Sequence, residues 1–99
     1  MNYTIDLSLK ARQELANASK WYDEKLEGLG EEFEREFFRK TDLIQSNPLH
    51  YPLKGKYRET TTDTFPYLIV FKIDQKKNII LIVSVFHTSR HPKKKISKQ

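Results

Sequence analysis

The sequence predicts a single small α+β domain with an N-terminal strand, an antiparallel α-helical hairpin and then three antiparallel strands, the helices lying on one face of the sheet. Two observations support this fold class: apolar residues recur at helical spacing before Pro48 and alternate with a period of two after it. The 99 residues suffice for one domain, placed at residues 1–93. Residues 94–99 are expected to form a flexible basic tail.

The first predicted elements are a short strand and a long helix. In NYTIDL, Tyr3, Ile5 and Leu7 alternate with polar residues, which is typical of a half-buried strand. Ser8 can cap the helix that follows, which should run to about Glu27. Its apolar positions are spaced by three or four residues, at Ala11, Leu15, Ala18, Tyr22 and Leu26.

A second helix is predicted directly after the first. The GLG sequence at residues 28–30 ends the first helix, because glycine readily adopts the left-handed conformation. The second helix begins near Leu29 and must stop by Asn47, since Pro48 disfavours a helical residue before it. Its apolar stripe contains Phe33, Phe37 and Ile44. So short a connection predicts an antiparallel helical hairpin.

Three strands follow a loop at residues 47–57, which contains two prolines and a glycine. KYRETTT at residues 56–62 is polar and rich in β-branched residues. FPYLIVFKI at 65–73 and NIILIVSVFH at 78–87 are more apolar, and the turn DQKKN joins them into a hairpin.

The last two strands are apolar on both faces, which is usual for central strands covered on both sides. We expect one face to hold Tyr67, Ile69, Phe71, Ile73, Ile79, Leu81, Val83 and Val85. The other face should hold Leu68, Val70, Ile80, Ile82 and Phe86. The deepest burial is expected for Leu15, Tyr22, Phe33, Phe37, Ile69, Phe71, Leu81 and Val83.

One helical hairpin can cover one face of this sheet, and no third helix is evident for the other. The second face must then be covered by the loop at 48–57, by the C-terminal tail or by another chain. The loop offers Leu49, Tyr51 and Leu53 for this purpose. We favour a partner protein, because an exposed apolar patch on a small domain normally marks an interaction site.

The charge of the chain is divided between its two halves. Residues 1–50 contain seven Lys or Arg and ten Asp or Glu, whereas residues 51–99 contain eleven and three. This asymmetry indicates either an anionic partner for the C-terminal half, such as a nucleic acid or an acidic protein, or a solvated basic tail.

Composition excludes several classes of protein. Without cysteine, the chain can form no disulfide, thiolate nucleophile or thiolate-bound zinc site. The N-terminus has no apolar signal region, and no apolar run approaches about 18 residues. We therefore expect a cytoplasmic protein without a membrane partner.

Metal and nucleophilic sites are not expected, and neither is a cofactor. His87 and His91 are four residues apart, but Pro92 opposes helical geometry and no acidic residue follows Asp74 as a third ligand. Ser84 and Ser89 flank His87 without a carboxylate nearby in the sequence to orient its imidazole.

General acid–base cleavage of RNA is the enzymatic hypothesis that the residues can support. His87 could transfer protons, while Arg58, Arg90 and Lys93 could neutralise phosphate charge. Alternatively, His87 only ends a strand and bonds to backbone, with Arg90 packed on an aromatic ring or paired with a carboxylate.

The order of elements, with WYDEKLEGLGEEF, FPYLIVFKI and VSVFHTSRHPKK at matching places, resembles the RelE/ParE toxins of bacterial type II toxin–antitoxin (plasmid stabilisation) systems. The resemblance spans about residues 3–93. It implies a small cytoplasmic toxin that a cognate antitoxin wraps and neutralises. The antitoxin would cover the second sheet face, at Leu68, Val70, Ile80, Ile82 and Phe86. A homodimer or a toxin–antitoxin hetero-oligomer is expected.

The family contains two mechanisms, and the resemblance favours the ParE-like one, in which the toxin binds DNA gyrase. RelE-like members cut messenger RNA on the ribosome with a cationic cluster and a late tyrosine or histidine. Here Leu68 replaces an arginine of that cluster, and no tyrosine follows Phe86. FHTSR resembles the His-x-x-Arg that follows the last strand of ParE-like toxins. The expected target-binding residues are His87, Arg90, Lys93, Lys94 and Lys95.

Two other functions stay open. The chain could be a RelE-like, ribosome-dependent mRNA endoribonuclease, with His87, Arg90 and Arg58 as its catalytic candidates and the ribosome and mRNA as partners. It could also be an inactive interaction module that has lost toxicity.

Overall fold

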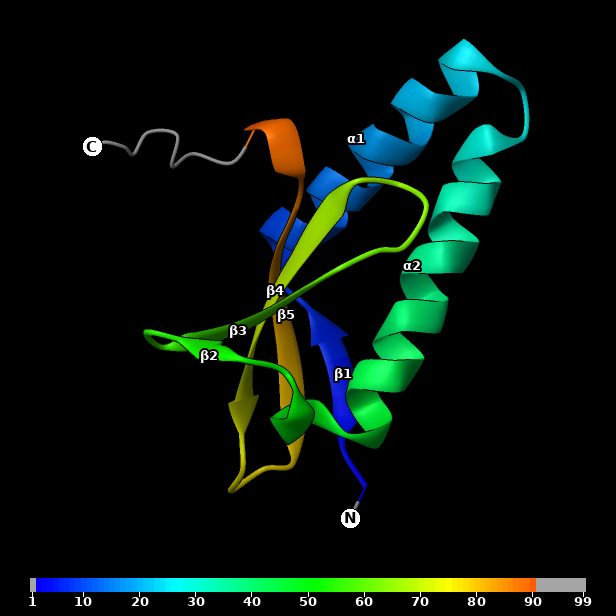
Figure 1. Ribbon diagram of the computed structural model, residues 1–99. Helices are drawn as coiled ribbons and strands as arrows, with labels where there is room; N and C mark the ends of the chain where they lie inside the picture. Colours follow the sequence, from blue (N-terminus) through cyan, green and yellow to red (C-terminus); the bar gives the residue numbers. More distant parts are fainter. Residues whose placement is uncertain (1, 91–99) are drawn as a thin grey trace.

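The computed structural model describes residues 2–90, so the tail expected at 94–99 lies outside the described residues. Two helices form one layer, and they pack on one face of a five-stranded sheet (Figure 1). This arrangement confirms the predicted α+β class and the position of the helical hairpin.

The elements occur in the predicted order. They are β1 (Thr4–Leu7), α1 (Leu9–Lys25), α2 (Leu29–Ser46), a 3-10 turn (Pro48–His50), β2 (Leu53–Lys54), β3 (Tyr57–Thr61), β4 (Tyr67–Asp74), β5 (Ile79–His87) and a second 3-10 turn (Thr88–Arg90). The short strand β2 was not predicted. It forms because Gly55, at φ 65°, reverses the chain between β2 and β3. Pro52, which has no N–H to donate, immediately precedes β2.

The helical hairpin depends on local features at its turn. The Ser8 side chain accepts a hydrogen bond from the backbone N–H of Ala11 at 3.0 Å, as predicted for the cap of α1. Gly30 lies at a close contact between the two helices, since a Cβ there would lie 2.3 Å from the carbonyl oxygen of Ser19. Its backbone N–H donates to Asp23 Oδ1 at 2.7 Å, which ties the start of α2 to α1.

The strand order in the sheet is β1-β5-β4-β3-β2. β4 and β5 pair antiparallel as predicted, and so do β3 and β4. β1 runs parallel to β5, with Thr4 opposite Ile79 and Leu7 opposite Ile82. The first and last strands are therefore neighbours, and the helical hairpin lies between them in the sequence.

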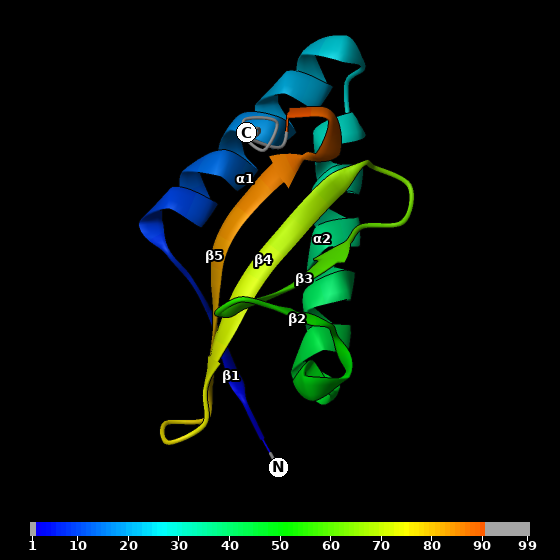
Figure 2. The ribbon, with the colours of Figure 1, turned by 60° about the vertical axis from the view of Figure 1, so that its left-hand side comes forward.

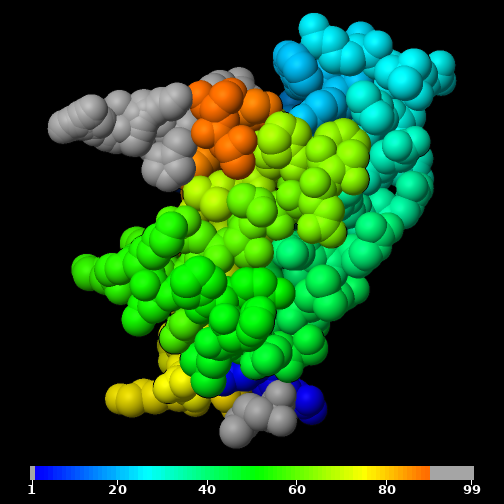
Figure 3. Space-filling model, in the orientation of Figure 1, coloured from blue at the N-terminus to red at the C-terminus, as the bar shows by residue number. Residues whose placement is uncertain are grey.

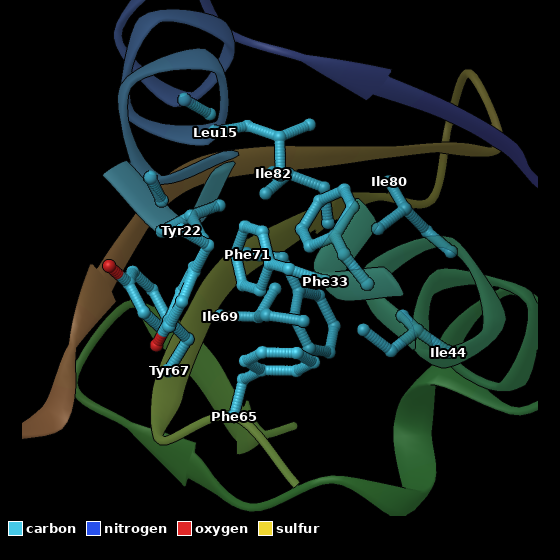
Figure 4. Packing of buried hydrophobic residues seen from close by; sticks show 14 residues of the cluster. Leu15, Tyr22, Phe33, Ile44, Phe65, Tyr67, Ile69, Phe71, Ile80 and Ile82 are labelled. Atoms are coloured by element: carbon cyan, nitrogen blue, oxygen red, sulfur yellow. The ribbon is translucent and has the colours of Figure 1, made fainter. Parts of the chain in front are cut away.

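The core lies between the helices and the sheet (Figure 4). Leu15, Tyr22, Phe33, Phe37, Ile69 and Phe71 are all buried, which confirms their predicted place in it. An aromatic group fills the end nearest the loop before β4, where the Tyr22 ring lies 4.8 Å from the Phe65 ring and the Phe33 ring lies 4.8 Å from that of Tyr67.

The predicted assignment of β5 side chains to the two faces was wrong. Ile80 and Ile82 are fully buried beneath the helices, whereas Leu81 and Val83 are partly exposed on the opposite face. The cause is a β-bulge: Val70 pairs with Ser84 and Phe71 with Ile82, which leaves Val83 without a partner. One extra residue reverses the alternation, so Val85 returns to the core side.

A buried carboxylate holds the loop between β3 and β4 against α2. Glu36 accepts hydrogen bonds from the backbone N–H of Thr64 at 2.7 Å and of Phe65 at 3.0 Å. Burial disfavours the charged carboxylate, but the hydrogen bonds from Phe65 and Thr64 outweigh burial and lower the pKa of Glu36. Glu36 thereby positions the Phe65 ring in the core.

The substitution Glu36→Gln should lower the free energy of unfolding by about 1–3 kcal/mol at neutral pH, because the buried N–H of Phe65 and the partly buried N–H of Thr64 lose an ionised acceptor. A lowered folded-state pKa stabilises the fold above the usual glutamate pKa of about 4.3 and ceases to do so as the pH falls through the folded value. The difference between wild type and variant in urea denaturation should therefore shrink at acid pH. The exposed control Glu24→Gln should show neither effect, and a pH-independent loss in Glu36→Gln would contradict this role.

Candidate functional site

The face of the sheet turned away from the helices, here called the outer face, is the first candidate site. Figure 2 shows β4 and β5 in front with both helices behind them. The outer face holds the side chains of Leu68, Val70, Ile79, Leu81, Val83 and Phe86. Within residues 2–90 no helix covers it, and apart from the buried Leu68 these side chains are partly exposed.

The loop at 48–57 does not cover the outer face, although this was one expected alternative. Tyr51 packs instead against the core, with its ring 6.0 Å from that of Phe71. Leu49 and Leu53 remain more than half exposed. A covering chain for the outer face must therefore come from outside the described residues.

The expected antitoxin-binding set requires a correction at two positions. Ile80 and Ile82 are 0% exposed in the core, so neither can contribute to a surface on the folded chain. Leu68, Val70 and Phe86 do belong to the outer face, and their role in binding stays a prediction. Leu81 and Val83 were assigned to the core from the sequence, but their side chains lie on the outer face, where Ile80 and Ile82 had been expected.

A second candidate site lies where β5 ends beside α1. A pocket of about 320 Å³ opens there, lined by Glu14, Asn17, Ala18, Trp21, Tyr67, Val85, Phe86 and His87. The rings of Tyr67 and His87 meet edge to face at 5.4 Å. The Glu14 carboxylate accepts hydrogen bonds from the Ser84 hydroxyl at 2.9 Å and the Val85 backbone N–H at 2.8 Å, so it is occupied in holding β5.

The proton arrangement of His87 is set by the turn that follows it. His87 Nδ1 accepts a hydrogen bond from the backbone N–H of Ser89 at 3.0 Å, and the Ser89 hydroxyl lies 2.7 Å from the same atom. An accepting Nδ1 leaves the proton of the neutral ring on Nε2. His87 therefore offers a hydrogen-bond donor at Nε2, and a role as general base there would need the other tautomer.

The structure does not bring Arg58 to His87. Arg58 pairs with Phe71 and His87 pairs with Tyr67, so they lie four positions apart along β4, or roughly 13 Å at strand spacing. Arg58 Nη1 donates to the carbonyl oxygen of Tyr51 at 2.7 Å. These two catalytic candidates thus do not share one site.

The remaining predicted site residues are not tested by the geometry. Arg90 lies in the 3-10 turn that follows β5, but its side chain is outside the described part of the structure, and so are Lys93, Lys94 and Lys95. Their role in target binding stays a prediction.

The α1 side of the pocket was not predicted from the sequence. Trp21 is 50% exposed, although a tryptophan carries the largest apolar surface in the chain. Trp21 lies outside the apolar stripe of α1, next to the buried Tyr22. A large aromatic residue at such a position could have been recognised in the sequence as a candidate surface contact. The role of Glu14 could not be recognised in the sequence, because Glu14 and its hydrogen-bond partner Val85 are 71 residues apart.

Among residues 2–90 no group of His, Asp or Glu is placed to hold a metal ion. None of the helices in that part of the chain is long and apolar enough to cross a membrane.

The comparisons with known proteins agree on one fold. A family model described as the ParE toxin of the type II toxin–antitoxin system parDE matches residues 5–92. The chain is similar to a chain of the chromosomal ParDE system from P. aeruginosa, with a TM-score of 0.75 and 12% identity over 86% of this chain and 95% of that one. It is also similar to a chain of the intact E. coli RelBE toxin–antitoxin complex, with a TM-score of 0.66 and 17% identity over 87% and 96%.

A chain of the RelBE2 toxin–antitoxin complex from Mycobacterium tuberculosis gives a TM-score of 0.58 and 20% identity over 88% of this chain and 99% of that one. At such low identity these likenesses show the fold alone. No curated protein matches the sequence.

The neutral ring of His87 should carry its proton on Nε2. Nitrogen-15 NMR of the imidazole should show this tautomer, and Ser89→Ala should preserve it because the backbone N–H remains. Ser89→Pro removes that donor and should give a mixture of tautomers. A wild-type ring protonated mainly on Nδ1 would contradict the assignment.

Proposed function

The chain belongs to the ParE toxin family and is the toxin of a type II toxin–antitoxin module, and we propose that it acts by binding DNA gyrase. The proposal makes it a binding protein, whose effect depends on association with its target. It also places the chain in the cytoplasm, where gyrase works.

The observation that carries this proposal is the separation of the catalytic candidates. Cleavage of RNA needs proton transfer and phosphate stabilisation at one place. Arg58 is bonded to Tyr51 and lies four positions along β4 from His87. Leu68, where RelE-like toxins have an arginine, is a buried apolar residue of the outer face. A binding mechanism does not require these residues to lie at one place.

The end of β5 is the proposed contact with gyrase. There His87 Nε2–H is a fixed donor, Trp21 is an exposed aromatic surface, and Arg90 with Lys93, Lys94 and Lys95 follows in the sequence. Aromatic residues and arginine are the side chains that most often dominate protein interfaces. The end of β5 therefore combines features of a recognition surface.

The outer face is the proposed binding site of the antitoxin. Its apolar side chains, among them Leu81 and Val83, are incompletely buried in the described structure. Burying such a surface releases about 25 cal/mol per Å² of apolar area. The basic C-terminal half fits an acidic antitoxin segment.

A ribosome-dependent endoribonuclease is the second candidate, because a histidine and an arginine follow each other closely at the end of β5. The two candidates differ in what His87 does. A nuclease would need its ring for proton transfer, whereas for a gyrase-binding toxin the ring would be one contact among several.

Purified chain should inhibit supercoiling of relaxed plasmid by gyrase. Arg90→Ala and deletion of residues 93–95 should raise the inhibitory concentration, because both remove contact groups, while His87→Ala should be comparatively mild. In the nuclease alternative, His87→Ala should reduce mRNA cleavage on purified ribosomes by about 10²–10⁴-fold with ribosome binding nearly unchanged. Specific ribosomal cleavage abolished by His87→Ala would overturn the gyrase proposal, and inactivity in both assays would favour an inactive module.

The substitution Leu81→Glu should weaken binding of the antitoxin by tenfold or more, because the complex would desolvate an unpaired charge. The isolated variant should stay folded, since Leu81 is partly exposed, whereas Ile82→Glu should unfold the chain from within its core. Calorimetry with the neutralising antitoxin and circular dichroism measure the two effects. Lys20→Glu on the exposed side of α1 is the charge control, and wild-type affinity in Leu81→Glu would exclude the outer face.

A further inference from the structure

We propose that the turn between β4 and β5 binds the phosphate backbone of a nucleic acid through Lys72, Lys76 and Lys77. All three side chains are exposed, and they line a groove of about 560 Å³ with Ile79 and Leu81. The turn projects from the end of the sheet opposite the 3-10 turn after β5 (Figure 1). This surface is therefore distinct from the proposed contact with gyrase.

The acidic residues beside these lysines are occupied by other partners. Asp74 Oδ1 accepts hydrogen bonds from the backbone N–H groups of Lys76 at 3.1 Å and Lys77 at 3.2 Å. Asp6 pairs with Arg12 at 3.0 Å. In residues 2–90 none of the ion pairs formed includes one of the three lysines. Their positive charge is thus available to an external anion.

The distribution of charge over the molecule favours a polyanion at this side. The helical hairpin, residues 9–46, contains seven cationic and nine acidic side chains, whereas residues 48–90 contain seven and three. The field of such a molecule repels a polyanion from the helices and attracts it to the sheet. An approaching nucleic acid is therefore oriented towards the lysines.

The exposed lysines of the turn suit the backbone of a nucleic acid. Figure 3 shows the turn as a projection at the lower edge of the molecule, so an extended polyanion can reach its lysines from solvent. The tip of the turn, residues 74–78, is polar, and the apolar part of the groove's lining comes from the flanking strands, at Ile73, Ile79 and Leu81. Lysine amines are point charges that suit successive phosphates along a backbone and carry no sequence preference of their own. We therefore expect binding without sequence specificity.

Either target of the toxin is compatible with a phosphate-binding site at this turn. Gyrase acts on DNA and the ribosome is largely RNA, so either target brings a phosphate backbone within reach of the turn. An assay that contains neither target tests the site by itself.

The test is binding of a fluorescein-labelled DNA duplex, measured by fluorescence anisotropy over a range of salt concentrations. Lys72→Gln/Lys76→Gln/Lys77→Gln should weaken binding by roughly tenfold or more at low salt, and the slope of log K against log salt should fall by about 2–3. The matched control Lys10→Gln/Lys20→Gln/Lys25→Gln removes the same charge from α1 and should change affinity less than about twofold. The double variant Lys76→Gln/Lys77→Gln leaves β4 intact and should lose part of the same affinity.

Three results would overturn the proposal. Equal weakening in both triple variants would mean that net charge alone drives binding. Unchanged affinity in the β4–β5 variants would place all binding elsewhere. Competition by poly-L-glutamate as effective as by unlabelled duplex of equal charge would identify an acidic peptide as the partner.

Discussion

The sheet is apolar on both faces, but the single layer of helices can cover only one of them. The rest of the structure depends on this constraint. The hairpin of α1 and α2 buries one face completely, including Phe71 and Ile82. The outer face keeps partly exposed side chains, and no other described segment supplies a cover. A toxin with this architecture retains an apolar surface on which a neutralising partner can act.

The bulge at Val83 decides which side chains fall on which face, and α1 stabilises the strand around it. β1 stops pairing at Ile82, so the backbone of β5 needs other partners beyond that point. The Ser8 backbone N–H donates to the Ile82 carbonyl at 2.9 Å, the Ser8 hydroxyl donates to the Val83 carbonyl, and Glu14 accepts from Val85. The first turns of one helix thereby replace a missing strand and lead β5 into the pocket at His87.

The elements could be predicted from the sequence because their signals are local. Ser8, Gly28 and Pro48 mark helix ends within a few residues, and the change of apolar period locates the strands. The faces of β5 could not be predicted, since the run from Ile79 to Val83 is apolar at every position and nothing in it reveals an extra residue. The separation of Arg58 from His87 also escaped prediction, because it depends on strand register.

The parallel pairing of β1 with β5 has a consequence for how the protein is made. β1 leaves the ribosome before both helices, yet its strand partner, beginning at Ile79, is the last of the described strands to be synthesised. The sheet therefore cannot close until β5 has emerged, and the contact between β1 and β5 joins residues far apart in the sequence. For a toxin this delay is useful, because the nascent chain lacks its finished surface until β5 has been made. An antitoxin already present can then meet the toxin as soon as it folds.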